Sequence, residues 1–153
     1  MTYDELVTNI RNYSQVGVEE FTAPVINTFI TFAENRIMRE IDLDVFKKEM
    51  TGNMTSGNRF LTAPTDLLTH RYMLLKSYVG STQVFLDFRD TSFMKEYWKD
   101  QTVTGTPKYF GVWDQNTFYV APTPSQNYIV ELGFIYRPEQ LSSTNTTTWI
   151  STN

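Results

Sequence analysis

The stretch VTGTPKYFGVWDQNTFYVAPTPSQNYIVELGFIYR, residues 103–137, decides the fold class. Within it, residues 108–113 and 117–122 alternate as half-buried strands do, and the DQN segment between them is typical of a hairpin loop. A Pro-containing turn then leads into residues 127–136, where one apolar face is made by Val130, Leu132, Phe134 and Tyr136. We therefore expect antiparallel strands that pair in sequence order, as a β-meander.

The same stretch carries few groups that can do chemistry. It has no His, and its charged residues are Lys108, Asp114, Glu131 and Arg137. Its many aromatic rings are explained by core and cross-strand packing. This composition indicates a rigid structural module.

The preceding region, from residue 45, also has a period of two. Residues 46–53 and 59–64 flank a Ser-Gly-Asn turn and predict a hairpin. Residues 68–79 and 84–89 predict a second one. Asp90 is then placed to cap a short helix over 91–99, in which we expect the apolar rings to turn inward, namely Phe93, Tyr97 and Trp98.

The N-terminal region predicts two helices. Thr2 and Glu5 have the spacing of a capping box, and the first apolar face contains Tyr3, Leu6, Val7, Ile10 and Tyr13. Pro24 suits the first turn of a second helix, capped by Thr22 or Ala23. Its apolar face contains Val25, Ile26, Phe29, Ile30, Ala33, Ile37 and Ile41, and its outward face Asn27, Glu34, Asn35 and Arg39.

Helices followed by strands indicate an α+β fold in one domain spanning residues 1–153. Its helical part covers residues 1–44 and its antiparallel β part residues 45–140. A polar segment, residues 141–153, follows and contains one apolar pair, Trp149 and Ile150.

Composition excludes several classes of function. The chain has no cysteine, so disulfides and zinc–thiolate sites are excluded. Its net charge of −4 disfavours binding to a nucleic-acid backbone. No apolar run reaches the roughly 20 residues of a membrane-spanning helix, and the start of the chain lacks the features of a signal peptide.

Candidate catalytic or metal-binding residues are few. The single histidine, His70, has no partner nucleophile or carboxylate nearby in the sequence, and we expect it on a strand surface. Asp42 and Asp44 lack the further acids of a calcium loop and indicate a solvated helix end. Because no phosphate-binding glycine loop or nucleophile motif occurs, we expect no enzyme activity and no cofactor.

The aromatic residues leave one alternative open. Exposed rings in a row bind carbohydrate without positive charge, so a carbohydrate- or receptor-binding β module is a second hypothesis. It requires Trp113 and Tyr119 to be accessible. These two rings, with Trp149 and Ile150, are our candidates for residues that contact other proteins.

The order of motifs resembles the head-to-tail adaptor proteins of tailed bacteriophages. The resemblance is carried by FITFAENRIMREI, FLTAPTDLL, FLDFRD and FMKEYW, in that order, within residues 29–98. It continues in a Gly-x-Pro-aromatic entry at Gly105, a hairpin closing on a Pro-containing turn, and a tyrosine-rich strand ending before Pro138. A Leu-Ser at Leu141, followed by Trp149, completes it.

The resemblance implies a non-enzymatic subunit of a ring, usually of twelve copies, beneath the portal of the capsid. Such a ring joins the portal to the tail or nozzle and lines the channel through which DNA passes without sequence-specific binding. The protein would be assembled in the host cytoplasm and kept in the neck of the virion. Another neck or tail-completion protein is a further alternative.

One departure concerns the end of the chain. These adaptors normally continue after the Trp-containing loop with one or two helices, whereas this sequence stops at Asn153. We therefore expect a neighbouring subunit or a further segment to cover the apolar faces of the first two helices. We also expect residues 142–153 to reorganise when the protein docks.

Overall fold

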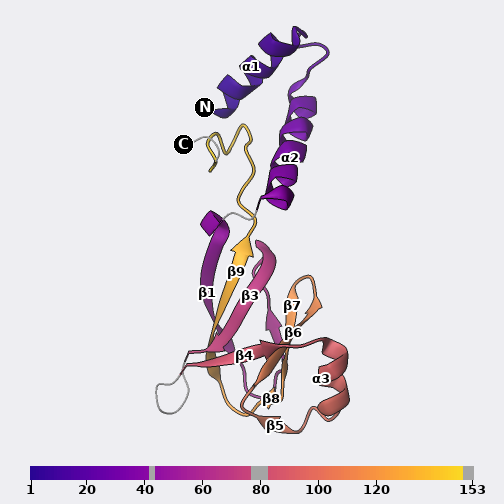
Figure 1. Cartoon of the computed structure of the whole chain (residues 1–153), viewed down its shortest axis with the longest axis vertical. Coiled ribbons are helices and arrows are strands. Elements are labelled where there is room, and N and C mark those ends of the chain that lie inside the picture. Colours follow the sequence, from indigo (N-terminus) through magenta and orange to yellow (C-terminus); the bar gives the residue numbers. More distant parts are fainter. Residues whose placement is uncertain (42–43, 77–82, 150–153) are drawn as a thin grey trace. The chain divides into compact units, whose positions relative to one another are not determined.

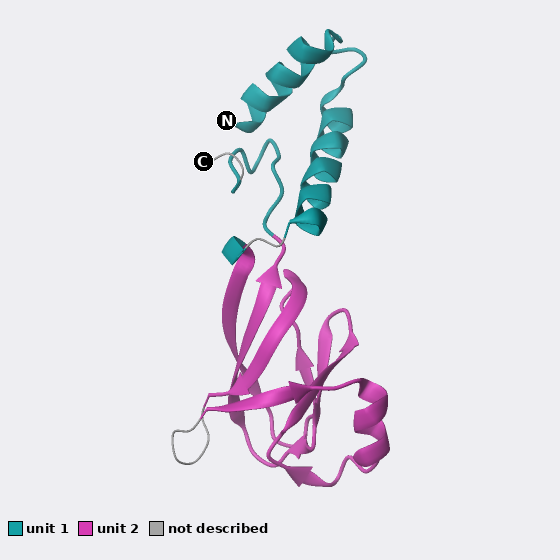
Figure 2. Ribbon diagram, viewed as in Figure 1, with its two compact units in different colours: residues 1–45, 138–153 teal, residues 46–137 magenta. Residues whose placement is uncertain are grey.

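A computed structural model describes residues 1–41, 44–76 and 83–149 (Figure 1). The chain divides into two compact units (Figure 2). Unit 1 comprises residues 1–45 and 138–153, and unit 2 comprises residues 46–137. Unit 1 contains two long helices and unit 2 contains the β-sheets, so the predicted α+β class is confirmed.

Helix α1 (Tyr3–Ser14) starts at the predicted capping box. The Thr2 hydroxyl accepts a hydrogen bond from the Glu5 N–H at 3.4 Å, and the Glu5 carboxylate accepts one from the Thr2 N–H at 2.8 Å. Tyr13 does not belong to the buried face, because it is 94% exposed. The helix ends at Ser14, one residue after Tyr13. Gln15 then takes a left-handed conformation (φ 54°) and turns the chain, so the last turn of the helix, which contains Tyr13, stays exposed.

Helix α2 (Ala23–Glu40) is preceded by Thr22 as N-cap, and Pro24 lies in its first turn as predicted. One part of its predicted outward face is wrong, because Glu34 is only 6% exposed. The segment after the last strand runs beside the helix here, and the Leu141 N–H donates to the Glu34 carboxylate at 3.3 and 3.4 Å.

The core of unit 1 is small. It contains Tyr3, Val7, Ile26, Ile30 and Leu141. The Tyr3 hydroxyl donates to Asn27 Oδ1 at 2.6 Å, and the Tyr3 N–H donates to the Thr146 carbonyl at 3.0 Å. Much of the apolar face predicted for α2 lies outside this core, since Phe29 is 50% and Ile41 48% exposed.

Unit 2 is built on a seven-stranded sheet with the order β1-β9-β3-β4-β6-β7-β2. The strands are β1 (Lys47–Met54), β9 (Tyr128–Tyr136), β3 (Leu67–Leu75), β4 (Val84–Phe88), β6 (Tyr109–Asp114), β7 (Thr117–Ala121) and β2 (Phe60–Thr62). All neighbours are antiparallel except β4 and β6, which are parallel. A separate parallel pair joins β5 (Thr104–Gly105) to β8 (Thr123–Pro124).

Two of the predicted hairpins are confirmed. Strands β3 and β4 pair with Met73 opposite Leu86. Strands β6 and β7 pair with Phe110 opposite Val120, and the Asp114 carboxylate accepts the Asn116 N–H at 2.8 Å to close the DQN loop.

The hairpin predicted across Ser56–Asn58 is wrong, because β1 pairs with β9 and β2 pairs with β7. The turn between β1 and β2 is held by a distant segment. The Gly57 N–H donates to the Pro124 carbonyl at 2.8 Å, and the Ser56 N–H donates to Asn127 Oδ1 at 2.9 Å. These bonds lead the chain away from β1 to the opposite edge of the sheet.

The strand order also departs from a meander, because β9 lies between β1 and β3 and does not pair with β7. Its predicted alternation is nevertheless confirmed, since Val130, Leu132 and Phe134 are buried in the core of unit 2. The rest of that core consists of Met54, Ala63, Met73, Leu75, Leu86, Phe110, Phe118, Val120 and Tyr128.

The short helix α3 (Thr91–Tyr97) is confirmed, with Asp90 accepting the Ser92 N–H at 2.8 Å. Its buried residue is Met94, whereas Tyr97 is 67% exposed, which corrects the predicted inward face. Met94 faces the sheet because it packs against Gly111 on β6, where an added Cβ would lie 2.7 Å from Met94 Cε. The missing side chain at Gly111 leaves room for the methionine, and the helix therefore turns that side to the sheet.

Candidate assembly surfaces

His70, the histidine considered as a catalytic candidate, is part of the packing of the sheet. The described residues contain no group of three or more His, Cys, Asp or Glu that could hold a metal ion. His70 is half-buried, not on the strand surface as predicted, and its ring stacks on Phe88 at a centroid distance of 4.4 Å. Burial lowers its pKa, so the imidazole is kept neutral. Asp42, one of the predicted acid pair, lies outside the described residues.

Trp113 on β6 is the most exposed ring of the sheet face that it shares with β7 and β2. It is 41% exposed and stacks on Tyr119 of β7, with centroids 5.7 Å apart and planes 24° apart. Phe60 of β2 meets both rings edge-on, at 5.6 and 5.5 Å. Tyr119 is only 2% exposed, so it supports Trp113 from below and offers no surface of its own.

A buried arginine lies beside this aromatic stack. Arg59 is 5% exposed, and its guanidinium donates to the Tyr119 hydroxyl and to Thr123 Oγ1, the latter at 2.8 and 3.2 Å. It also reaches the main-chain oxygens of Trp98 and Asp100 at 3.4 Å each. All of these acceptors are neutral.

Two lysines of the α3 region complete what we call the basic recess, a hollow of about 400 Å³ lined by Arg59, Phe60, Lys95, Trp98, Lys99, Gln101, Trp113 and Tyr119. Lys95 Nζ lies 4.2 Å from the centre of the Trp113 ring, a cation–π contact. The sequence stretch around Trp113 is poor in cations, but the fold brings three of them to it. Sequence reasoning missed this because the cations come from elements far from residue 113 along the chain.

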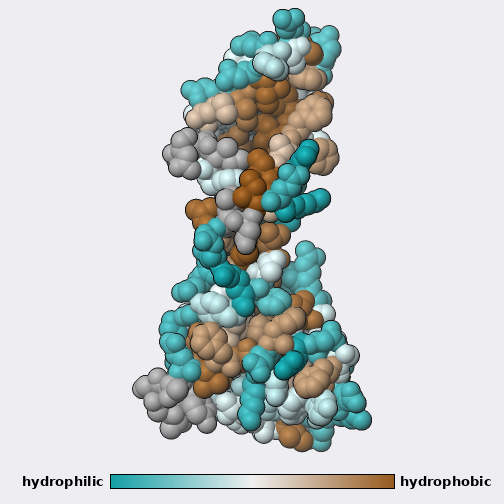
Figure 3. All heavy atoms as spheres, in the orientation of Figure 1, coloured by the Kyte–Doolittle hydropathy of each residue, from teal (hydrophilic) through white to brown (hydrophobic). Residues whose placement is uncertain are grey.

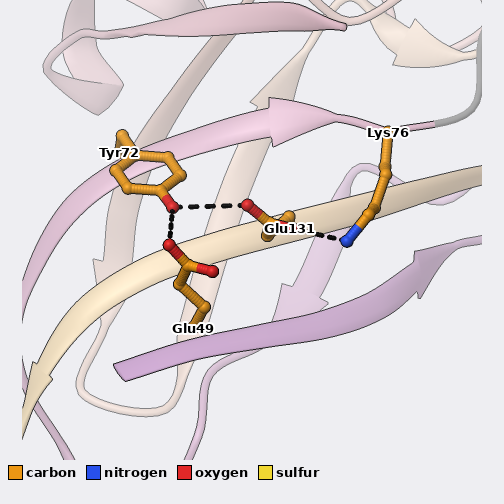
Figure 4. A network of polar contacts seen from close by, with 4 residues as sticks. All are labelled: Glu49, Tyr72, Lys76 and Glu131. Atoms are coloured by element: carbon orange, nitrogen blue, oxygen red, sulfur yellow. Dashed lines mark hydrogen bonds and ion pairs between the residues drawn. The ribbon is translucent and has the colours of Figure 1, made fainter. Parts of the chain in front are cut away.

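A polar network ties three strands together on the outer face of the sheet (Figure 4). The Tyr72 hydroxyl donates to Glu49 at 2.7 Å and to Glu131 at 3.3 Å, and Lys76 pairs with Glu131 at 2.6 Å. The hydrogen bond to Glu49, with lesser help from burial and both carboxylates, raises the pKa of Tyr72 to about 12. The phenol therefore stays protonated and acts as a hydrogen-bond donor, and the network links strands β1, β9 and β3.

Unit 1 carries an open apolar groove of about 370 Å³ between its helices and the C-terminal segment. Figure 3 shows hydrophobic residues gathered on this face of unit 1. The lining residues are Met1, Leu6, Ile10, Phe29, Ile30, Ala33, Glu34, Ile37, Leu141 and Thr148. Burial raises the pKa of Glu34, against the opposing effect of the Leu141 N–H.

The last two predicted contact residues lie at the end of the chain. Trp149 is half-buried in the C-terminal segment, and Ile150 lies outside the described residues. The basic recess and the apolar groove are two of the hollows on the described residues; another, of about 460 Å³, is lined by Lys47, Lys48, Glu49, Arg71, Tyr72, Gly133 and Phe134.

The model of the SU10 adaptor protein family matches residues 1–153. The chain belongs to the SU10 adaptor protein family. This membership confirms the resemblance to phage head-to-tail adaptors. Among curated proteins, none matches the adaptor significantly.

Family membership makes this adaptor a structural protein of bacteriophages, from a family of adaptors and not from a class of enzymes. It is a component of the virion and acts through contacts with other phage proteins. No helix of the described residues is long and apolar enough to cross a membrane.

Proposed function

We propose that the adaptor is a head-to-tail connector subunit. Copies of it form a closed ring beneath the portal, join the portal to the tail or nozzle, and line part of the DNA channel. Twelve copies are the number that the resemblance implies. The observation that carries the proposal is the family match over residues 1–153.

The surfaces of both units support a role in assembly. The apolar groove of unit 1 leaves several large apolar side chains in contact with water, and a soluble protein gains free energy when a partner covers such a patch. Unit 2 is stiffened by β9, which pairs along its length with β1 on one side and β3 on the other, by the Glu49–Tyr72–Glu131 network and by stacked aromatic rings. A rigid unit suits a part that transmits mechanical load between head and tail.

The charge of the chain supports passage of DNA without tight binding. A net charge of −4 offers few phosphate-neutralising contacts along a channel wall, so DNA would slide through the ring without sequence-specific binding. The proposed ring is assembled in the host cytoplasm and requires no catalytic residue and no cofactor.

Residues 142–153 are proposed to reorganise on docking to the portal. In the free chain this segment contacts α1 through the Tyr3–Thr146 hydrogen bond. A variant that lacks residues 142–153 is therefore expected to lose portal binding while unit 2 stays folded. Unchanged binding of that variant to purified portal protein would remove this part of the proposal.

A carbohydrate- or receptor-binding role is the weaker alternative, because it needs a row of exposed rings. Tyr119 is almost fully buried beneath Trp113, so this pair presents one ring to a ligand. A glycan array separates the hypotheses. We expect no glycan to bind, and a glycan whose binding is lost in Trp113→Ala would favour the alternative.

The direct test is reconstitution. Full-length adaptor is mixed with purified portal protein, and the products are examined by light scattering and electron microscopy. We expect a ring that binds one end of the portal. A protein that remains monomeric and ignores the portal would contradict the proposed function.

A further inference from the structure

The two units differ sharply in charge. Unit 1 has nine acidic and three basic residues, a net charge of −6, whereas unit 2 has eight acidic and ten basic residues, a net charge of +2. Charges of opposite sign on two surfaces favour their association and fix its orientation. An interface between unit 1 of one copy and unit 2 of another would therefore be complementary.

The basic recess of unit 2 contains a buried positive charge, Arg59, whose nearest acidic neighbour, Asp100, interacts with it electrostatically but forms no close ion pair with it. No carboxylate of the described residues lies within ion-pairing distance of Arg59, and the carboxylate of nearby Asp100 accepts from Thr102 instead. Buried charges in proteins are normally paired. Lys95 and Lys99, both exposed at the same recess, form no ion pair with a carboxylate of residues 1–41, 44–76 or 83–149.

The chemistry of the recess defines its ligand. Three cations attract carboxylates, and the half-exposed Trp113 ring adds an apolar surface next to them. The fitting group is an acidic side chain with an apolar neighbour. A nucleic-acid strand fits less well, because it needs a line of cations along several phosphates, whereas these cations gather in one hollow.

One segment of the chain has this chemistry. Between α1 and α2, Glu19 and Glu20 are exposed, and Val18 beside them is 63% exposed. Among the other described acids of the two helices, Asp4 is exposed but lies in the first turn of α1 between the buried Tyr3 and the capping Glu5. Glu5 caps α1, Glu34 is buried, and Glu40 pairs with Arg36 at 2.8 Å.

We propose that the basic recess of one copy binds the Glu19–Glu20 loop of a second copy. The two surfaces are different, so the contact is heterologous and repeats from copy to copy, as a closed ring requires. The inference rests on the proposed ring, for which it specifies the interface between neighbours.

Charge reversal tests the contact in the full-length protein. Lys95→Glu with Lys99→Glu removes the attraction at the recess, and Glu19→Lys with Glu20→Lys removes it at the loop. Each pair is expected to weaken self-association at least about tenfold in sedimentation velocity. The variant with all four substitutions regains opposite charges and is expected to recover most of the association.

A matched control changes the charge of unit 2 elsewhere. Lys108→Glu with Arg137→Glu makes the same change of charge at two exposed residues outside the recess and is expected to self-associate like the wild type. Circular dichroism and urea unfolding establish that every variant is folded. If the wild type forms rings and both charge-reversed variants form them equally well, the inference is overturned and the proposed function stands. If the wild type stays monomeric, both are overturned.

Zero-length cross-linking locates the contact independently. A carbodiimide joins a carboxylate to a lysine that touches it, and mixing ¹⁴N- and ¹⁵N-labelled copies distinguishes links between copies from links within one. We expect mixed-isotope links from Glu19 or Glu20 to Lys95 or Lys99. Links found only within one copy would overturn the proposal. So would binding of a 12-nucleotide DNA strand that is lost in the variant with Lys95→Glu and Lys99→Glu while that variant still forms rings.

Discussion

Gly133 lies in the middle of β9, directly beneath the ring of Tyr72 from the neighbouring strand. An added Cβ would overlap that ring and would lie 2.7 Å from Tyr72 Cδ1. The glycine thus allows the phenol to cross the strand and reach Glu49 and Glu131. One residue without a side chain permits the network that joins β1, β9 and β3.

Gly133→Ala is expected to lower the free energy of unfolding by about 1–3 kcal/mol, because the ring must move and the strand is overpacked. Urea unfolding of the full-length protein measures the loss. Gly52→Ala on β1 is the matched control, since its added Cβ would lie at an ordinary 3.7 Å from Val130. Equal stability of the two variants would show that the Tyr72 ring moves aside without an energetic cost.

Glu34 shows how one buried carboxyl makes the stability of unit 1 depend on pH. Burial raises its pKa in the folded state above the ordinary value of 4.5, so folding disfavours the ionised form. The resulting destabilisation is present above the folded-state pKa and disappears as the pH falls below 4.5.

Glu34→Gln removes the charge but keeps an oxygen that accepts the Leu141 N–H. We expect this variant to melt at a higher temperature than the wild type at pH 7 and at the same temperature below about pH 4.5, as followed by circular dichroism. Glu40→Gln, which alters an exposed carboxylate paired with Arg36, is the control and should show no gain at pH 7. A Glu34→Gln variant that is less stable at pH 7 would contradict this account.

At the scale of single elements, α3 packs on the sheet through one fully buried side chain, Met94, with Phe93 and Trp98 in contact with Tyr109 of β6. Met94 is fully buried between the helix and β6, above the open space at Gly111. The helix has only seven residues and would be marginal alone. Its position matters because the lysines of the basic recess come from this region.

Met94→Ala is expected to cost about 2–4 kcal/mol of unfolding free energy, through lost burial and the cavity that remains. Glu96→Ala, at an exposed position on the same helix, should change it by less than about 0.5 kcal/mol. Urea unfolding of the two variants compares them directly. Similar, small losses would mean that α3 is held by its aromatic neighbours.

Local signals explain which elements were predictable. The capping box at Thr2 and the N-cap at Asp90 depend on residues two or three positions apart, and so do the DQN turn and the alternation along β9. The pairing of β1 with β9 joins Lys47 to Ile135, and no local pattern specifies that register. The wrong hairpin across Ser56–Asn58 has the same cause, since bonds to Pro124 and Asn127 decide it.

The candidate surface was predictable only in part. Trp113 was chosen as one of the aromatic rings of residues 103–137 that could face another molecule, and it is 41% exposed. Tyr119 lies on the neighbouring strand β7, and its burial follows from the packing of Trp113 and Phe60 against its ring. The cations of the recess meet these rings only through the tertiary fold.

At the scale of the whole molecule, the opposite charges of the two units predict self-association that depends on salt. The Debye length falls from about 10 Å at 0.1 M to about 3 Å at 1 M salt. We expect the adaptor's self-association to weaken several-fold over this range in sedimentation velocity. An association that strengthens with salt would indicate that the apolar groove of unit 1, and not the charged surfaces, joins the copies.

The central claim is that the adaptor connects head and tail. A cryo-electron microscopy reconstruction of the neck of the phage particle tests it most directly. The account predicts a closed ring of this α+β fold between the portal and the tail, with DNA or an open channel along its axis. A neck without this fold, or the fold found at the receptor-binding end of the tail, would contradict it.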